Sequence, residues 1–231
     1  MELLKYNINT SFCCLFLSTF FSLLLTPFLI RYGKKFNYLD YPNDRKKHKK
    51  EVVNIGGISI LVGIFSVLNA VYILMKLNKV IIFDDLYLII PLIFFTNLII
   101  FTTGFYDDRY SLSPFLRLVI QISSASLMWI MGLRIDLIDF TFINPNYALI
   151  NIPTILSYVI TVIWIAGIVN AINWLDGMDG LAAGVCLLIS LGMMVIAFEI
   201  GNNLAIIFSS SIIGSCIGFL AYNFTPAKII M

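Results

Sequence analysis

Charged side chains are scarce in this chain. Lysine, arginine, aspartate and glutamate together make up 12% of the 231 residues, which is about half their share in a typical soluble domain. Hydrophobic residues make up 60%, and the mean hydropathy is +0.94. These proportions exclude a water-soluble globular domain and predict a polytopic membrane protein.

Cysteine and histidine are also few. The four cysteines fall inside apolar segments without the Cys-x-x-Cys spacing of a metal site, so we expect them to pack as apolar residues. They are Cys13, Cys14, Cys186 and Cys216. The net charge is only +2. The basic run from Arg45 to Lys50 adjoins an apolar segment, where membrane topology and attraction to anionic lipid explain it as well as a binding role does. We therefore expect membrane lipid as a partner and no nucleic acid.

Long apolar runs are what the chain has in abundance. Seven of them are long enough to cross a bilayer as helices, which takes about 17–25 residues. They lie at about 11–30, 56–76, 86–105, 115–132, 153–170, 181–199 and 204–222. The predicted fold class is therefore all-α, a polytopic membrane helix bundle with one membrane domain over residues 1–231. Between two runs, residues 133–152 are less apolar and alternate loosely, which predicts a short external hairpin.

The basic residues predict the orientation of the bundle. If all seven runs cross the membrane, eleven of the fifteen lysines and arginines fall on one side. They are Arg31, Lys34, Lys35, Arg45, Lys46, Lys47, Lys49, Lys50, Arg109, Arg117 and Lys228. Since cytoplasmic loops carry an excess of lysine and arginine, this side should be cytoplasmic and the N-terminus should lie outside.

The polar stretch Asn170–Leu181 stands between two of the apolar runs. Its asparagines and aspartates recur every third residue, a step that drifts by about 60° around a regular helix. They are Asn170, Asn173, Asp176 and Asp179. Gly177 and Gly180 allow the backbone to unwind, so we expect a helix end that opens into a polar loop. Ionisable groups beside a membrane usually face a functional site, and carboxylates suit Mg²⁺; a turn that merely joins two helices explains them less well.

Two further polar segments fall on the same predicted side. The loop Gly104–Pro114 holds the adjacent carboxylates of Asp107 and Asp108, which repel each other unless a cation or a shared proton relieves them. Asp84-Asp85, on the other side, is interpreted as an ordinary solvated pair. The loop Asp40–His48 holds cations that can neutralise a diphosphate and the single histidine. Its candidate residues are Arg45, Lys46 and His48.

These segments resemble those of the polyprenyl-phosphate N-acetylhexosamine-1-phosphate transferases of glycosyltransferase family 4. Asn170–Leu181 is similar to the family pattern Asn-x-x-Asn-x-x-Asp-Gly-x-Asp-Gly-Leu. Asp107–Pro114 resembles Asp-Asp-x-x-x-Leu-Ser-Pro, and Arg117 and Gln121 continue the likeness. The stretch Asp40–His48 resembles Asp-x-Pro-Asn-x-Arg-Lys-x-His.

The likeness departs from the family at two places. Val53 stands where the family usually has a proline before its pair of glycines, which makes the local backbone uncertain. Asn223–Met231 resembles Asn-Phe-x-Pro-Ala-Lys-Ile-Phe-Met, after which the family continues with Gly-Asp-x-Gly-Ser and further spans. We therefore expect a C-terminally truncated chain, about the first two-thirds of the family fold, that inserts into the membrane and has little transferase activity. The alternatives are a non-catalytic membrane protein, half of a split enzyme, and a transporter; polar groups at one membrane face disfavour the last.

The resemblance implies transfer of N-acetylhexosamine 1-phosphate from UDP-N-acetylhexosamine to a polyprenyl phosphate such as undecaprenyl phosphate, which begins cell-wall or lipopolysaccharide intermediates. It implies a location in the bacterial inner membrane and Mg²⁺ as the cofactor, with Mn²⁺ as the alternative ion. The catalytic and metal-binding candidates are Asp107, Asp108 and Asp176. The substrate-binding candidates are Asn170, Asn173, Asp179, Arg45, Lys46 and His48. The hexosamine, the division between base and metal ligand, and the choice between monomer and homodimer stay open, although the first loop is closer to the N-acetylglucosamine-type branch.

Overall fold

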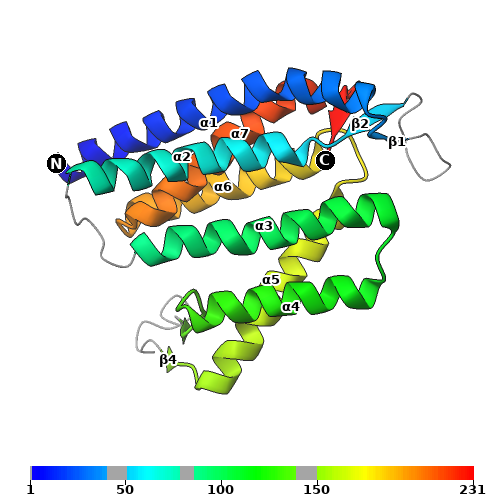
Figure 1. Ribbon diagram of the computed structural model, residues 1–231. Coiled ribbons are helices and arrows are strands. Elements are labelled where there is room, and N and C mark those ends of the chain that lie inside the picture. The colour runs from blue at the N-terminus through cyan, green and yellow to red at the C-terminus, as the bar shows by residue number, and fades with distance from the viewer. Residues whose placement is uncertain (1, 41–50, 79–85, 139–149) are drawn as a thin grey trace. The chain divides into compact units, whose positions relative to one another are not determined.

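The computed structural model describes residues 2–40, 51–78, 86–138 and 150–231. These residues form seven helices and two small sheets (Figure 1). The helices are α1 (Glu2–Lys35), α2 (Gly57–Asn78), α3 (Leu86–Tyr110), α4 (Pro114–Ile130), α5 (Thr154–Leu175), α6 (Leu181–Glu199) and α7 (Asn203–Asn223). The strands are β1 (Leu39–Asp40), β2 (Val52–Asn54), β3 (Leu137–Ile138), β4 (Ile150–Asn151) and β5 (Ile229–Ile230).

Six of the described helices are long and apolar enough to cross a membrane, and the other, α4, has 17 residues. The prediction of an all-α, multi-pass membrane bundle is confirmed. A length of about 17 residues is the lower limit for a span, so the seven predicted spans correspond to six long helices and one short helix. These segments are helical because lipid offers no hydrogen-bond partners, so each segment must pair its own backbone N–H and C=O groups.

The chain is divided between two compact units. Unit 1 comprises Met1–Ile82 and Trp174–Met231, and unit 2 comprises Phe83–Asn173. Unit 1 therefore contains α1, α2, α6 and α7 with strands β1, β2 and β5, whereas unit 2 contains α3, α4, most of α5 and strands β3 and β4. The boundary falls in the last turn of α5. The expectation that residues 1–231 form one membrane domain stays a prediction.

Helix α7 forms the core of unit 1, where it packs against α1, α2 and α6. Small residues line its contact with α1. Thr19 Oγ1 donates a hydrogen bond to the Gly214 carbonyl at 3.0 Å, and Ser22 Oγ donates to the Ser215 carbonyl at 2.9 Å. A Cβ at Gly218 would lie 2.8 Å from the Cβ of Ser22, so only glycine allows the two helices to approach this closely. Small residues and interhelical hydrogen bonds of this kind drive helix association where lipid provides no hydrophobic force.

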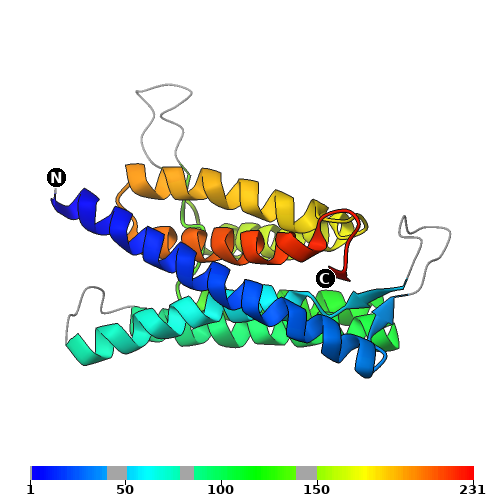
Figure 2. The same ribbon diagram turned by 90° about the horizontal axis from the view of Figure 1, so that it is seen from above.

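A three-stranded sheet of very short strands lies at the end of unit 1 opposite to the start of α1 (Figure 2). Strand β2 pairs antiparallel with β1 and parallel with β5, so Val53 is opposite both Leu39 and Ile229. The side chains of Val53 and Ile229 are completely buried. No strand was predicted here from the sequence, in which Val53 departs from the family pattern. The sheet joins the segment before α2 to the segment after α7.

The hairpin predicted over residues 133–152 of unit 2 is confirmed by the antiparallel pairing of β3 with β4. It is fastened to α4 and α5 by polar contacts. Asp136 accepts hydrogen bonds from Arg134 Nε at 2.7 Å and from Ser157 Oγ at 2.9 Å, and Trp129 Nε1 donates to Ser157 Oγ at 3.0 Å. The bond from Arg134, and then that from Ser157, lowers the pKa of the Asp136 carboxyl below its usual range.

Candidate functional site

The acidic pair of unit 2 lies in the last turns of α3. This helix continues to Tyr110 rather than ending near residue 105, so the prediction that Asp107 and Asp108 lie in a loop is wrong. The helix can continue because polar side chains near a membrane surface reach water while the backbone stays hydrogen-bonded. The Asp107 carbonyl accepts the N–H of Ser111 at 2.8 Å, and Ser111 has a left-handed φ of 49°, which turns the chain toward α4.

Asp107 is paired with a cation from α4. Arg117 Nη1 donates to Asp107 Oδ2 at 2.7 Å, and the two side chains are 32% and 18% exposed, respectively. A pair this accessible to water contributes only about 0–1 kcal/mol to stability. Its main effect is therefore geometric, because it fixes the direction of the Asp107 carboxylate. Asp108, the next residue along the helix, is exposed.

Helix α5 carries the two asparagines of the polar stretch. It ends at Leu175, five residues later than predicted, so Asn170 and Asn173 are helical and the polar loop begins at Asp176. The expectation of a helix end that opens into a polar loop is confirmed. Asn170 Nδ2 donates to Gln121 Oε1 of α4 at 2.6 Å and to the Ala166 carbonyl at 2.8 Å. Asn173 is exposed.

The loop after α5 belongs to unit 1 and is anchored at its second aspartate and its second glycine. Asp179 Oδ2 accepts the N–H of Ala227 at 3.1 Å, and Asn223 Oδ1 accepts the N–H of Gly180 at 3.0 Å. Gly180 has φ of 73°, a conformation that favours glycine. Gly177, the other glycine expected to unwind the backbone, does not adopt a positive φ.

Asn223 was not among the predicted site residues, yet it connects three parts of unit 1. It is 3% exposed, and besides accepting from Gly180 it donates from Nδ2 to the Ile229 carbonyl at 2.8 Å. Ile229 in turn lies in β5, beside β2. The signal in the sequence is an amide in the last position of a mostly apolar helix, a group that is costly to bury without partners.

The segment before α2 contacts β5 through Gly56. Its N–H donates to the Ile230 carbonyl at 2.8 Å. A Cβ at Gly56 would lie 2.5 Å from the ring of Phe219 and 2.6 Å from the Ile230 oxygen, so a larger residue cannot occupy the position without displacing backbone. Three segments distant in sequence thus converge at one end of unit 1: the residues around Gly56, the turn at Gly180 and the residues after α7.

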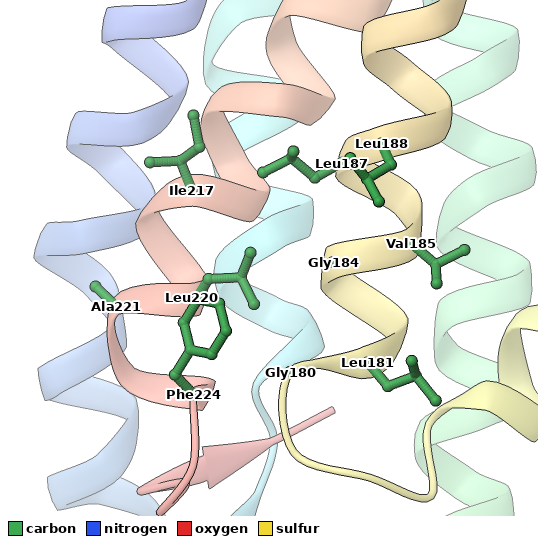
Figure 3. Close-up of a pocket in the computed structure, with 10 residues that line it drawn as sticks. All are labelled: Gly180, Leu181, Gly184, Val185, Leu187, Leu188, Ile217, Leu220, Ala221 and Phe224. Atoms are coloured by element: carbon green, nitrogen blue, oxygen red, sulfur yellow. The ribbon is translucent and has the colours of Figure 1, made fainter.

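An apolar groove runs from this turn along α6 and α7 (Figure 3). Its volume is about 630 Å³, and its lining is almost entirely hydrophobic. The lining residues are Gly180, Leu181, Gly184, Val185, Leu187, Leu188, Ile217, Leu220, Ala221 and Phe224. The groove places apolar surface directly beside a polar turn.

The predicted site residues are distributed over both units. Unit 2 holds Asp107, Asp108, Asn170 and Asn173, and unit 1 holds Asp176 and Asp179. The convergence of the two acidic pairs stays a prediction, because they belong to different units. Arg45, Lys46 and His48 lie outside the described residues, as does the pair Asp84-Asp85. Within each unit, the described residues include no group of three histidine, cysteine, aspartate or glutamate side chains arranged to hold a metal ion.

Comparison with known proteins decides the family. Residues 90–231, more than half of the chain, match the model of glycosyl transferase family 4. The chain belongs to this family. The resemblance found in the sequence motifs is confirmed.

Three relatives each match more than half of the chain. It is 34% identical over 209 residues to a probable undecaprenyl-phosphate N-acetylglucosaminyl 1-phosphate transferase of Bacillus subtilis, which covers 90% of this chain and 54% of that protein. It is 27% identical over 205 residues to a decaprenyl-phosphate N-acetylglucosaminephosphotransferase of Mycolicibacterium smegmatis, covering 85% and 49%, respectively. A phospho-N-acetylmuramoyl-pentapeptide-transferase of Leuconostoc citreum is 35% identical over 129 residues, covering 54% and 38%. The chain spans about half the length of the first two relatives.

Proposed function

We propose that this protein transfers N-acetylhexosamine 1-phosphate from a UDP-sugar to a polyprenyl phosphate, with release of UMP. The observation that carries the proposal is the polar turn between α5 and α6. Asp179 in this turn is hydrogen-bonded to Ala227, which follows α7, and Gly180 is hydrogen-bonded to Asn223, the last residue of α7. Polar groups are costly beside a bilayer and usually mark a functional site. Two hydrogen bonds that hold one short turn in place favour a ligand-binding site there, rather than a flexible loop that only connects two helices.

The names of the relatives support the proposed substrates. The B. subtilis protein is named for undecaprenyl phosphate and N-acetylglucosamine, and the M. smegmatis protein for decaprenyl phosphate and N-acetylglucosamine. Both match more of this chain, 90% and 85%, than the muramoyl-pentapeptide transferase of L. citreum, at 54%. The proposed donor is therefore a UDP-N-acetylglucosamine-type sugar.

The acidic side chains fit Mg²⁺, with Mn²⁺ as the alternative. Mg²⁺ prefers oxygen ligands and is usually held by one or two carboxylates together with substrate phosphates, so it does not require three protein ligands in one cluster. The proposed ligands are Asp107, Asp108 and Asp176. One oxygen of Asp107 is engaged by Arg117, which leaves the second oxygen to face an ion. When bound, the ion would neutralise phosphate charge during the transfer.

We assign the other predicted residues to positioning of the substrates. Positioning and charge neutralisation together account for most of the catalysis in phosphoryl transfer. In this proposal the cations of the first loop bind the diphosphate, and the amides and second aspartate of the polar stretch bind the nucleotide. The residues are Arg45, Lys46 and His48 for the diphosphate, and Asn170, Asn173 and Asp179 for the nucleotide.

The proposed location is the bacterial inner membrane, with the N-terminus outside and the site on the cytoplasmic side. The support is the charge asymmetry, eleven of fifteen lysines and arginines on one side, because cytoplasmic loops are enriched in these residues. Nucleotide sugars are available on that side, so the orientation agrees with the proposed donor.

The test is release of UMP from UDP-N-acetylglucosamine by the full chain in detergent, with polyprenyl phosphate and Mg²⁺. We expect turnover that is low for residues 1–231 alone, as predicted from the sequence. This turnover should be lost on removal of Mg²⁺ and reduced by about 10²–10³ in Asp107→Asn, as for loss of one electrostatic contact in a reacting centre. The matched control is Asp136→Asn, the same change in the hairpin of unit 2, which should leave turnover unchanged. Absence of UMP release together with absence of UDP-N-acetylglucosamine binding would contradict the proposal and favour a non-catalytic membrane protein.

A further inference from the structure

Helix α4 contacts two candidate site segments of unit 2 through one of its faces. Arg117 and Gln121 are four residues apart, so they lie one above the other on the same side of the helix. Arg117 bonds to Asp107 on α3, and Gln121 bonds to Asn170 on α5. Gln121 is buried, and a buried amide that lacks partners is costly. This face, Arg117 with Gln121, is called the α4 positioning face below.

The orientation of the Asn170 amide follows from its partners. The Ala166 carbonyl can only accept a hydrogen bond, so the Asn170 group 2.8 Å away must be Nδ2. Gln121 Oε1 lies 2.6 Å from the same Nδ2 and takes its second hydrogen. Both hydrogens of Asn170 are therefore committed within the protein. Oδ1, whose contact with Gln121 Nε2 is at the long distance of 3.5 Å, keeps acceptor capacity because a carbonyl oxygen has two lone pairs.

We propose that Gln121 is a positioning residue, which turns the Asn170 carboxamide so that it offers an acceptor oxygen, and not its NH₂ group, to the substrate. This inference rests on the proposed function and refines it. A site that offers an acceptor binds a hydrogen-bond donor, such as the imide N–H or a hydroxyl of the nucleotide sugar, and does not bind a phosphate oxygen. The α4 positioning face thereby sets the direction of both Asp107 and Asn170.

The same pair of helices supplies a structural control. Ser126 of α4 and Tyr158 of α5 share a hydrogen bond of 2.9 Å, nearer the hairpin end of these helices. This bond fastens α4 to α5 without touching Asn170. If Gln121 only held the two helices together, removing either bond would affect the protein in the same way.

The experiment compares Gln121→Met, Gln121→Glu and Ser126→Ala in the UMP-release assay. Gln121→Met keeps the length of the side chain but removes the acceptor, and we expect a roughly 10- to 100-fold loss in kcat/KM for the UDP-sugar, most of it as a raised KM for that substrate. Gln121→Glu retains an oxygen for Asn170 Nδ2 and should recover much of the loss. Ser126→Ala should leave KM unchanged.

A double-mutant cycle with Asn170→Ala separates positioning from packing. In the Asn170→Ala background, Gln121→Met should cause no further loss, because the group that it orients is gone. Equal losses in both backgrounds, or equal KM values for Gln121→Met and wild type, would overturn the inference.

A readout besides turnover keeps the inference testable if the proposed function fails. Asparagine-selective ¹⁵N labelling allows exchange of the Asn170 side-chain NH₂ protons to be followed in detergent. These protons should exchange slowly in the wild type, faster in Gln121→Met, and slowly again in Gln121→Glu. If the wild type neither binds the UDP-sugar nor releases UMP, the proposed function is wrong; exchange that is equally fast in all variants shows instead that Gln121 does not hold Asn170.

Discussion

Replacing Asn223 by alanine should release the polar turn of unit 1 from the rest of the unit. The asparagine accepts the Gly180 N–H at 3.0 Å and donates to the Ile229 carbonyl at 2.8 Å, and it is 3% exposed. Alanine would leave one donor and one acceptor without these partners in a place that water reaches poorly. Each unsatisfied buried group costs about 1–3 kcal/mol, so the expected loss in the free energy of unfolding is about 2–6 kcal/mol.

The control for this prediction is Asn202→Ala on the same helix. Asn202 caps the N-terminus of α7 by accepting the Ala205 N–H at 3.0 Å, and it is exposed. Loss of such a cap costs about 1 kcal/mol. The assay is thermal unfolding in detergent together with hydrogen exchange of the Gly180 amide. If Asn223→Ala is no more destabilising than Asn202→Ala and the exchange at Gly180 is unchanged, the view of Asn223 as the link between these segments is wrong.

Three further predictions concern other parts of the chain. Gly218→Val should destabilise the α1–α7 contact by about 1–3 kcal/mol through overpacking, and the melting temperature should fall. The control is Gly192→Val, which should change the melting temperature far less, because a Cβ at this glycine would meet nothing within 4 Å. A cysteine at position 85 should react with an impermeant reagent added outside intact cells and a cysteine at Asp108 should not; the reverse pattern would contradict the predicted orientation. Because the pKa of Asp136 is lowered in the folded protein, its contribution to stability is present above the unfolded pKa of about 3.9 and is lost as the pH falls through the folded pKa. Exchange protection of the Ile152 amide, which donates to the Asp136 carbonyl, should therefore fall in acid, and protection that does not change with pH would show that the carboxylate does not stabilise the hairpin.

The helices were predictable because long apolar runs leave a chain in lipid no other regular form. The predicted ends were less accurate at α3 and α5, which continue to Tyr110 and Leu175. Hydropathy ends a segment at its first polar residues, yet Asp107 and Asn170 are accommodated in helices by side-chain partners on α4. Those partners are more than nine residues away in the sequence, so no local pattern indicates them.

The sheet of unit 1 could not be predicted for a different reason. Strands of two or three residues are too short to show an alternating pattern, and the parallel pairing joins Val53 to Ile229 across almost the whole chain. The polar turn at Gly180 was predicted from its residue types. Asn223, which connects this turn to β5, was missed, because one amide at a helix end gives a weak signal until its buried partners are known.

The proposed function requires that Asp107 and Asp108 bind the same Mg²⁺ ion as Asp176. The most direct measurement is cross-linking between cysteines at Asp108 and Asp176, in a background without the four natural cysteines, using reagents of graded length. Oxygens that bind one Mg²⁺ lie about 2.0–2.1 Å from the ion and therefore within roughly 4 Å of each other, so carboxylates more than roughly 12 Å apart cannot share an ion. We expect efficient cross-linking by reagents of that span. We expect none between Asp108 and Asn202, because the predicted topology places these two residues on opposite sides of the membrane. Failure of the Asp108–Asp176 pair to cross-link with any reagent up to that length, while both cysteines remain reactive, would contradict it.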